Sequence, residues 1–434
     1  MPFDKLFIFD RILLCLMMRL LLFLLCIAEV SLYTACQNIA GPVFSPVIIL
    51  VVSFAVGFLG LRLAKARLPQ MRYLSAFPRS VLKVSGILIF LGLSVWMVVM
   101  LIPAFKQVPM NETAYSDVML TYIHMVKNFT HGKPAFESFS NVSYMISPAY
   151  LPFQWMPFIV SELLNFDYRW VAIASVMLAS LYFFLQNSKD AQGANPFWKL
   201  IIPVWPLVVC LSLMRSNVFA FQITVESLVA GYYLLLVTAI DKNKWILLAI
   251  GLAICVLSRM SVALWVPLCL LAFFYSPDRR KAFYIAAILG LFVVVFYVPF
   301  VVKNPSLLSN PYQAYLMPIV GSWERNELMN GFSFNAWGMI FLKGSALEKV
   351  MAYQKIHFYV SCFTIVLLAT AWFKARKVNS LNNYLLFSLK IYLTVFYTFI
   401  QLPFIYLYIV PLIVTSAILS SVFITDRAGS RSQH

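Results

Sequence analysis

Charged residues are scarce in this chain of 434 residues: Asp, Glu, Lys and Arg together make up only 11% of it. Soluble globular proteins carry about a quarter of such residues. Acidic residues are the scarcest, with 16 Asp and Glu against 33 Lys and Arg, while hydrophobic residues reach 62%. This balance excludes a soluble globule and predicts a polytopic membrane protein.

Cysteine patterns are also missing. The seven cysteines lie mainly inside apolar runs and show no metal-ligand spacing, so we expect packing residues and no disulfide framework. No internal repeat, low-complexity tract or soluble domain is visible, and the sequence predicts one membrane domain over residues 1–434.

Long apolar runs are abundant, and about twelve of them approach the roughly twenty residues that cross a bilayer. They lie near 11–30, 43–62, 84–103, 169–186, 200–214, 219–240, 245–257, 261–275, 282–302, 356–373, 383–401 and 403–424. The first run is too long for a cleaved signal peptide and counts as a span. The sequence therefore predicts an all-α bundle of about twelve transmembrane helices.

The basic residues gather in short segments that fall on one side when the spans are counted. They are Lys5, Arg62, Lys65, Arg67, Arg72, Arg79, Lys83, Lys189, Lys199, Lys242, Lys244, Arg279, Arg280, Lys281, Lys374, Arg376, Lys377, Arg427 and Arg431. The positive-inside rule makes this side cytoplasmic and places both termini there. The net charge of +17 thus reflects topology and does not predict nucleic-acid binding.

Two long segments fall on the opposite side, at residues 104–168 and 303–355. They hold the acidic residues Glu112, Asp117, Glu137, Glu162, Asp167, Glu324, Glu327 and Glu348. We therefore expect any chemistry to face away from the cytoplasm.

The first outer loop contains two helical patterns. Residues 111–131 place apolar side chains at helical spacing, which predicts an amphipathic helix on the outer membrane surface with Asp117 in its first turn. Asp117 is then either a helix-terminal acid without a chemical task or a catalytic base. Residues 147–157 are broken by prolines, which favours a re-entrant or interfacial segment under a cavity roofed by 104–168.

Three ionisable residues interrupt the predicted spans near their outer ends: Arg215, Glu226 and Arg259. Counting 1.5 Å per residue from the cytoplasmic turns puts all three at a similar depth, roughly 20–23 Å above the inner interface. Charges at such depth indicate function by default. The alternative is an Arg215–Glu226 ion pair that only fixes helix packing.

Arg259 has no acid in its own turn, residues 257–261. An unpaired cation at this depth suits a lipid-linked phosphate. Lys303 and Arg325 from the second outer loop either add to such a site or are solvated surface charges.

These residues together resemble the GT-C superfamily of polytopic glycosyltransferases, in particular its polyprenol-phosphate mannosyltransferase-like branch. The motifs are Tyr115-Ser116-Asp117, Tyr122, Gly132, Tyr150-Leu151-Pro152, Phe221-Gln222 through Gly251, Arg259, Trp265-Val266-Pro267, Arg279-Arg280-Lys281 and Phe332 to Gly338. They cover most of the chain in the right order. The first outer loop departs from the family in lacking an Asp-x-Asp or Glu-x-Asp pair, and Arg259 stands where a Lys is expected.

The resemblance implies transfer of one sugar, with inversion, from a polyprenyl-phosphate carrier to a glycan, lipid or protein acceptor. Asp117 is the expected base, and Arg259, Arg215, Lys303 and Arg325 are the expected phosphate ligands. The residues expected to position sugar or acceptor are Glu112, Tyr122, His124, His131, Tyr150, Glu226, Trp323, Glu324 and Asn335. No cofactor is expected, and no ligand motif supports a divalent cation.

Three other functions compete with this one. A transporter or flippase would have ionisable residues spread along a path toward the cytoplasmic side, whereas the buried charges here, Arg215, Glu226 and Arg259, share one depth. A lipid-linked glycan polymerase or ligase would have the same topology, and a non-catalytic scaffold leaves Arg259 unexplained. The expected location is a bacterial inner membrane, with the endoplasmic reticulum as the alternative because Asn-x-Ser/Thr matches occur at 111, 128 and 141.

Overall fold

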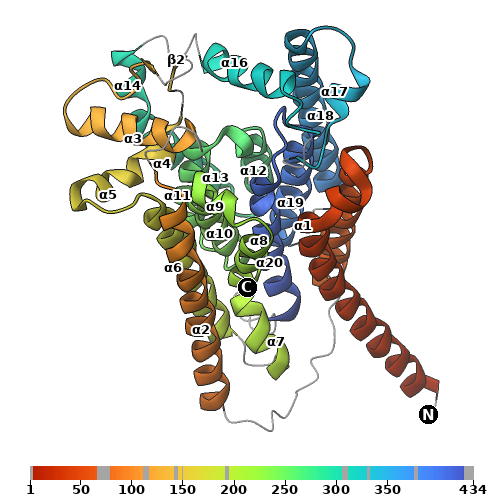
Figure 1. Ribbon diagram of the computed structural model, residues 1–434. Helices are drawn as coiled ribbons and strands as arrows, with labels where there is room; N and C mark the ends of the chain where they lie inside the picture. Colours follow the sequence, from red (N-terminus) through yellow and green to blue (C-terminus); the bar gives the residue numbers. More distant parts are fainter. Residues whose placement is uncertain are drawn as a thin grey trace.

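The computed structural model is almost entirely helical (Figure 1). It describes residues 3–65, 79–110, 117–140, 145–148, 150–190, 195–304, 311–329, 333–375 and 380–424. Within these ranges the strands are β1 (Phe139–Ser140) and β2 (Met145–Ile146), which pair antiparallel. The all-α prediction is confirmed.

Eight helical segments among the described residues are long and apolar enough to cross a membrane. They are Leu13–Tyr33, Asn38–Ala64, Ser80–Gln107, Arg169–Lys189, Pro196–Ser216, Arg279–Lys303, Ala346–Lys374 and Ile405–Phe423. The other four predicted spans coincide with helices that are shorter or less apolar: α10 (Glu226–Asp241), α11 (Trp245–Ser258), α12 (Trp265–Phe274) and α19 (Leu381–Phe399). A multi-pass membrane protein is thus confirmed, and the count of twelve spans is not.

The first helix, α1 (Phe3–Lys65), is a hairpin of two spans. Gly41 has a φ of +66°, a left-handed conformation that glycine adopts readily, and Pro42 follows it. The hydroxyl of Ser53 donates to the carboxylate of Glu29. Because these two residues lie twelve positions on either side of Gly41, the two halves of α1 must run antiparallel.

The remaining elements fill in the bundle and cover one end of it. The bundle also contains α2 (Arg79–Gln107), α6 (Arg169–Asp190), α7 (Pro196–Ile201), η2 (Ile202–Val204), α8 (Trp205–Ser216), α9 (Val218–Ile223), η3 (Met260–Val262), α13 (Arg279–Phe296), α14 (Val298–Lys303), α18 (Ala346–Ala375), η4 (Ile405–Tyr408) and α20 (Ile409–Phe423). The outer segments contain α3 (Asp117–Thr130), α4 (Pro152–Trp155), η1 (Met156–Phe158), α5 (Ile159–Leu164), α16 (Pro311–Glu324) and α17 (Trp337–Phe341). In Figure 1, α3, β2, α14, α16 and α17 gather at the end opposite the N terminus.

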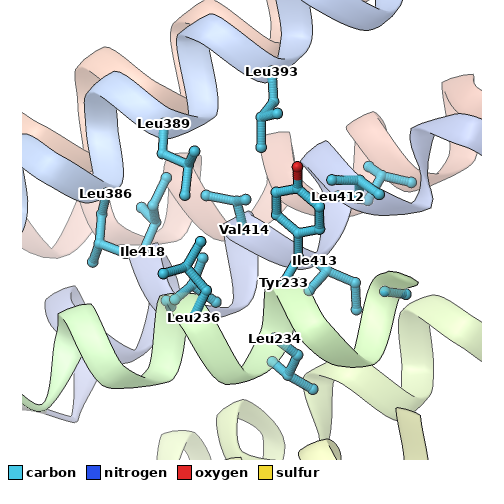
Figure 2. Close-up of a cluster of buried hydrophobic side chains, with 14 of the residues drawn as sticks. Tyr233, Leu234, Leu236, Leu386, Leu389, Leu393, Leu412, Ile413, Val414 and Ile418 are labelled. Carbon is cyan, nitrogen blue, oxygen red and sulfur yellow. The ribbon is translucent and has the colours of Figure 1, made fainter. Parts of the chain in front are cut away.

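Three helices form the centre of the bundle: α10, α19 and α20. Nearly all of their side chains are buried, and Figure 2 shows residues of α10, such as Tyr233 and Leu236, meeting Leu389 of α19 and Val414 of α20. Helices that are apolar all round lie inside a bundle. The central helices therefore position whatever side chains stand at their ends.

Gly231 brings α10 into close contact with α6. A Cβ added there would lie 2.5 Å from the Oγ of Ser175 and 2.8 Å from its carbonyl carbon. We expect Gly231→Ala to lower the free energy of unfolding by about 1–3 kcal/mol, because overpacking forces the helices apart. Thermal unfolding in detergent measures this, with Gly290→Ala as control, since nothing lies within 4 Å of that position. Equal melting temperatures of the two variants would contradict this close packing.

A buried ion pair ties the α1 hairpin to the central helices. Nζ of Lys390, at the middle of α19, lies 2.5 Å from Oε1 of Glu29 and 2.9 Å from the carbonyl oxygen of Pro411. Thr415 donates to the other carboxylate oxygen at 3.2 Å. Both charged side chains are almost fully buried, at 0% and 3% exposure. Burial of two charges is tolerated only with such complete pairing.

A second buried pair stands at the other end of α10 from Glu226. Lys242 lies 2.9 Å from Asp241 and donates to the side-chain oxygen of Asn187 at 2.8 Å. The expectation that all buried charges share one depth is therefore wrong. It failed because Glu29 and Lys390 are single charges within long apolar runs, which the sequence reading passed over.

We expect Lys390→Met to lower the free energy of unfolding by about 3–5 kcal/mol, because Glu29 then stays buried without its partner. The double variant Glu29→Gln with Lys390→Met removes both charges and should regain most of this loss. Lys355→Met, at an exposed position of α18, is the control. If the single and double variants have the same melting temperature, the ion pair does not couple the α1 hairpin to the central helices.

Candidate functional site

The outer ends of two short helices bring together Glu226 and Arg259. Glu226 is the first residue of α10, which has 16 residues, and Arg259 follows the last residue of α11, which has 14. At 1.5 Å per residue these helices rise about 24 and 21 Å. The two helices are thus similar in length, and the depth of these ends in a membrane stays a prediction.

The two side chains form a bidentate ion pair. Nη1 of Arg259 lies 2.7 Å from Oε2 of Glu226, and Nη2 lies 2.5 Å from Oε1. The prediction of an unpaired Arg259 is therefore wrong, and so is the alternative Arg215–Glu226 pair. Arg215 is exposed and lies one residue before the end of α8. Depth counting gives the level of each residue but no rotation about its helix axis, so it could not choose between the two arginines.

Three hydroxyl groups lie close together near the guanidinium. The phenol of Tyr397 lies within electrostatic range of Arg259 and donates to Oγ of Ser261 at 3.1 Å. The hydroxyl of Tyr233 lies 2.8 Å from the same Ser261 oxygen. The bidentate bond to Glu226 is therefore the contact that holds the guanidinium.

A small pocket with a cavity volume of about 20 Å³ lies beside the ion pair. Apolar atoms make up most of its surface, and Glu226 and Tyr406 supply polar groups. The full lining is Leu213, Ser216, Asn217, Ala220, Phe221, Thr224, Glu226, Ser227, Ile405, Tyr406 and Ile409. An apolar cavity with a few convergent polar groups is the usual form of a ligand site.

Tyr406 links this pocket to the outer loops. Its phenol lies within electrostatic range of Glu226 and Arg259, and also of Asp117 and Glu327. Asp117 is half-buried in the first turn of α3, where the sequence places it. One acid from each outer loop thus lies within electrostatic range of Tyr406.

Several residues expected to bind substrate in the first outer loop hold that loop together. Tyr122 is fully buried, and its ring packs 4.6 Å from that of Tyr150. The ring of His124 stacks on Phe139 at 4.1 Å, and its Nε2 lies 3.0 Å from a backbone oxygen. His131 is exposed, with Nδ1 2.7 Å from a carbonyl of its own helix. None of these four residues lines the pocket described above.

The charged candidates of the second outer loop are exposed. Lys303 is the last residue of α14 and is exposed, as is Glu324. Nε of Arg325 lies 2.8 Å from Glu327, which pairs these neighbours on the surface. Trp323 by contrast is buried, and its Nε1 donates to the carbonyl of Gln401 at 2.9 Å. Lys303 and Arg325 are therefore exposed charges, whereas Arg259 is partly buried.

Asn335 anchors the segment before α17 and is 1% exposed. Its Nδ2 donates to the hydroxyl of Tyr353 at 3.0 Å and to the carbonyl of Thr398 at 2.5 Å. Its Oδ1 accepts from the backbone of Trp337 at 2.9 Å. With these groups engaged, Asn335 fixes the loop against α18 and α19 and has no remaining amide proton directed at the pocket.

The proline-broken stretch at 147–157 forms α4 and η1, which confirms the predicted break. Arg169 fastens this layer to the bundle: it binds Asp167 at 2.5 Å and donates to the carbonyls of Val108 at 2.7 Å and Phe105 at 3.0 Å. The sequence reading missed Arg169, although a cation directly before an apolar run was visible. It also missed Tyr397 and Tyr406, which no charge or spacing marks.

Glu112, which is expected from the sequence to position sugar or acceptor, lies outside the described residues. Within them, no group of three or more His, Cys, Asp or Glu side chains comes together as a metal site would require. Comparisons with protein-family models, with curated proteins and with solved structures gave no match to this chain.

Proposed function

We propose that the chain is a membrane glycosyltransferase that moves one sugar, with inversion, from a polyprenyl-phosphate donor to an acceptor on the extracytoplasmic face. One observation carries this proposal: the Arg259–Glu226 pair stands beside a mainly apolar pocket lined by Tyr406, and Asp117 lies within electrostatic range of that tyrosine. An apolar wall suits an isoprenoid chain, and a guanidinium suits its phosphate.

Arg259 is the proposed phosphate ligand. A guanidinium has five N–H donors, and Glu226 takes one from each terminal nitrogen. The donors that remain can bind a phosphate while Glu226 holds the planar group in place. As the bond from the anomeric carbon to the phosphate oxygen breaks, negative charge grows on that oxygen, and a fixed cation stabilises it.

Asp117 is the proposed general base. Inversion requires the acceptor oxygen to attack the anomeric carbon from the face opposite the departing phosphate, while a carboxylate takes the hydroxyl proton. Asp117 comes from the outer loop, whereas Arg259 comes from the bundle, and the mechanism requires them to contact the sugar from opposite faces. Products are the glycosylated acceptor and free polyprenyl phosphate.

The proposal includes a location: a bacterial inner membrane, with both termini cytoplasmic and the site on the outer face, as the distribution of basic residues favours. Mass spectrometry of lipid-linked and surface glycans from cells with and without the chain tests it. We expect one sugar to disappear from a surface glycan, and its polyprenyl-phosphate form to accumulate. Unchanged glycans and donor lipids would refute it.

Transport of a lipid-linked sugar is the second candidate, because buried ion pairs stand at the middle of α19 and at both ends of α10. Such a series of charges is common along transport paths. Proteoliposomes with a fluorescent polyprenyl-phosphate sugar separate the two functions. A transporter moves the lipid between leaflets without forming a new glycosidic bond, whereas a transferase forms the bond on one side.

A further inference from the structure

A short segment of the first outer loop exposes several large apolar side chains. They belong to α5 and to the link that follows it, and they are Val160, Leu163, Leu164 and Phe166, with exposed fractions of 51%, 72%, 69% and 37%. The first three lie at spacings i, i+3 and i+4, which places them on one face of the helix. We call these four residues the α5 tip. Single exposed apolar residues are common, whereas a group of them marks an interaction site.

The acids of the same segment are bound to buried partners. The carboxylate of Glu162 accepts a hydrogen bond from the hydroxyl of Tyr168 at 2.6 Å, and Tyr168 is buried. Asp167 is paired with the buried Arg169 at 2.5 Å. A helix on a water-facing surface turns its charged side chains outward and its apolar side chains inward. This segment has the reverse arrangement, which favours an apolar environment outside it.

The α5 tip lies next to a predicted membrane span. α6 begins at Arg169, three residues after Phe166, and Arg169–Lys189 is long and apolar enough to cross a membrane. In Figure 1, α5 projects to the side above α6. α5 has six residues, about 9 Å of helix at 1.5 Å per residue, which is too short to cross a bilayer. A short apolar helix that leads directly into a span suits the membrane surface.

The inward side of α5 packs against the layer that carries α3. Ile159 packs against a buried cluster that includes Phe158 and also Met119 and Tyr122 of α3. Because α3 begins at Asp117, the depth of α5 in a membrane also sets the height of this carboxylate above it. The α5 tip thus has a partner for each side: protein inward, and an apolar phase outward.

We propose that the α5 tip is a membrane anchor, whose side chains insert among the lipid acyl chains at the Arg169 end of α6. None of its four side chains carries a charge, so none must remain in water. Interfacial helices of this kind reach about 5–10 Å into the boundary between headgroups and acyl chains. The anchor holds the layer with α3 at one depth. This inference goes beyond the proposed function, and it is tested without donor or acceptor.

Spin labels on introduced cysteines of the full chain in phospholipid vesicles test the anchor. Oxygen concentrates among acyl chains, whereas a charged nickel chelate stays in water, so the two relaxation reagents report the surroundings of each label. Leu163→Cys places the label on the α5 tip. Leu291→Cys, 60% exposed within the candidate span Arg279–Lys303, is the lipid control. Lys133→Cys, an exposed position beyond α3, is the water control. The unmodified chain gives the background from its own cysteines.

We expect oxygen to relax the label at position 163 more strongly than nickel does, as at position 291, and the order to reverse at position 133. Leu164→Cys repeats the measurement on the same face and should give the same order as position 163. Stronger relaxation by nickel at both tip positions would place the tip in water and overturn the proposal. Weak relaxation by both reagents would show that protein, such as a second copy of the chain, covers the tip, which also overturns it.

Discussion

Replacing Asp117 by Asn is expected to reduce glycosyl transfer about 100- to 10,000-fold, the usual contribution of a general base. The amide keeps the size of the side chain but cannot take the proton of the acceptor hydroxyl. Loss of the negative charge at the start of α3 lowers the free energy of unfolding by about 0.3–1 kcal/mol through the helix dipole. This is too little to unfold the protein. Release of polyprenyl phosphate in proteoliposomes measures the rate.

The control is Glu137→Gln, which removes an exposed acid from the same outer loop. It should retain the parental rate, because Glu137, unlike Asp117, is not among the charges that act on Tyr406 at the pocket. Full activity of the Asp117→Asn protein would exclude Asp117 as the base. Equal loss in both variants would point to the overall charge of the loop instead.

Arg259→Met is expected to have two effects, one on stability and one on donor binding. It leaves Glu226 buried without a partner, which should lower the free energy of unfolding by about 3–5 kcal/mol. It also removes charge-assisted hydrogen bonds to the phosphate, each contributing about 1.5–3 kcal/mol. Donor affinity should therefore fall about 10- to 100-fold, while affinity for the acceptor changes little.

The double variant Arg259→Met with Glu226→Gln separates these effects. It removes both charges, so thermal stability should largely return, but donor affinity should not. Arg280→Met, at an exposed position at the start of α13, is the control for loss of a positive charge. Recovery of donor binding in the double variant would show that Arg259 serves only to neutralise Glu226.

Helix positions and depths were readable from the sequence because they follow from chain length and apolar runs. Counting residues from the basic turns puts Glu226 and Arg259 at one level, and the structure joins them. The pattern of residues 111–131 likewise gives α3 with Asp117 in its first turn. These features depend on local rise and on periodicity, which one sequence contains.

Pairing across the bundle was not readable, because it depends on how each helix is rotated and which helices are neighbours. Arg259 and Glu226 are 33 residues apart, and Glu29 and Lys390 are 361 apart. The search for a partner of Arg259 within its own turn could not find either pair. The count of twelve spans is not confirmed, because α10, α11 and α12 have 16, 14 and 10 residues, fewer than the roughly twenty that cross a bilayer.

The most direct test of the donor site is photolabelling with a polyprenyl phosphate that carries a diazirine on its isoprenoid chain. The account predicts labelled peptides at residues 213–227 and 405–409, protected by an excess of unlabelled polyprenyl-phosphate sugar. Labelling spread evenly over the lipid-facing side of α13, without protection by that competitor, would contradict it.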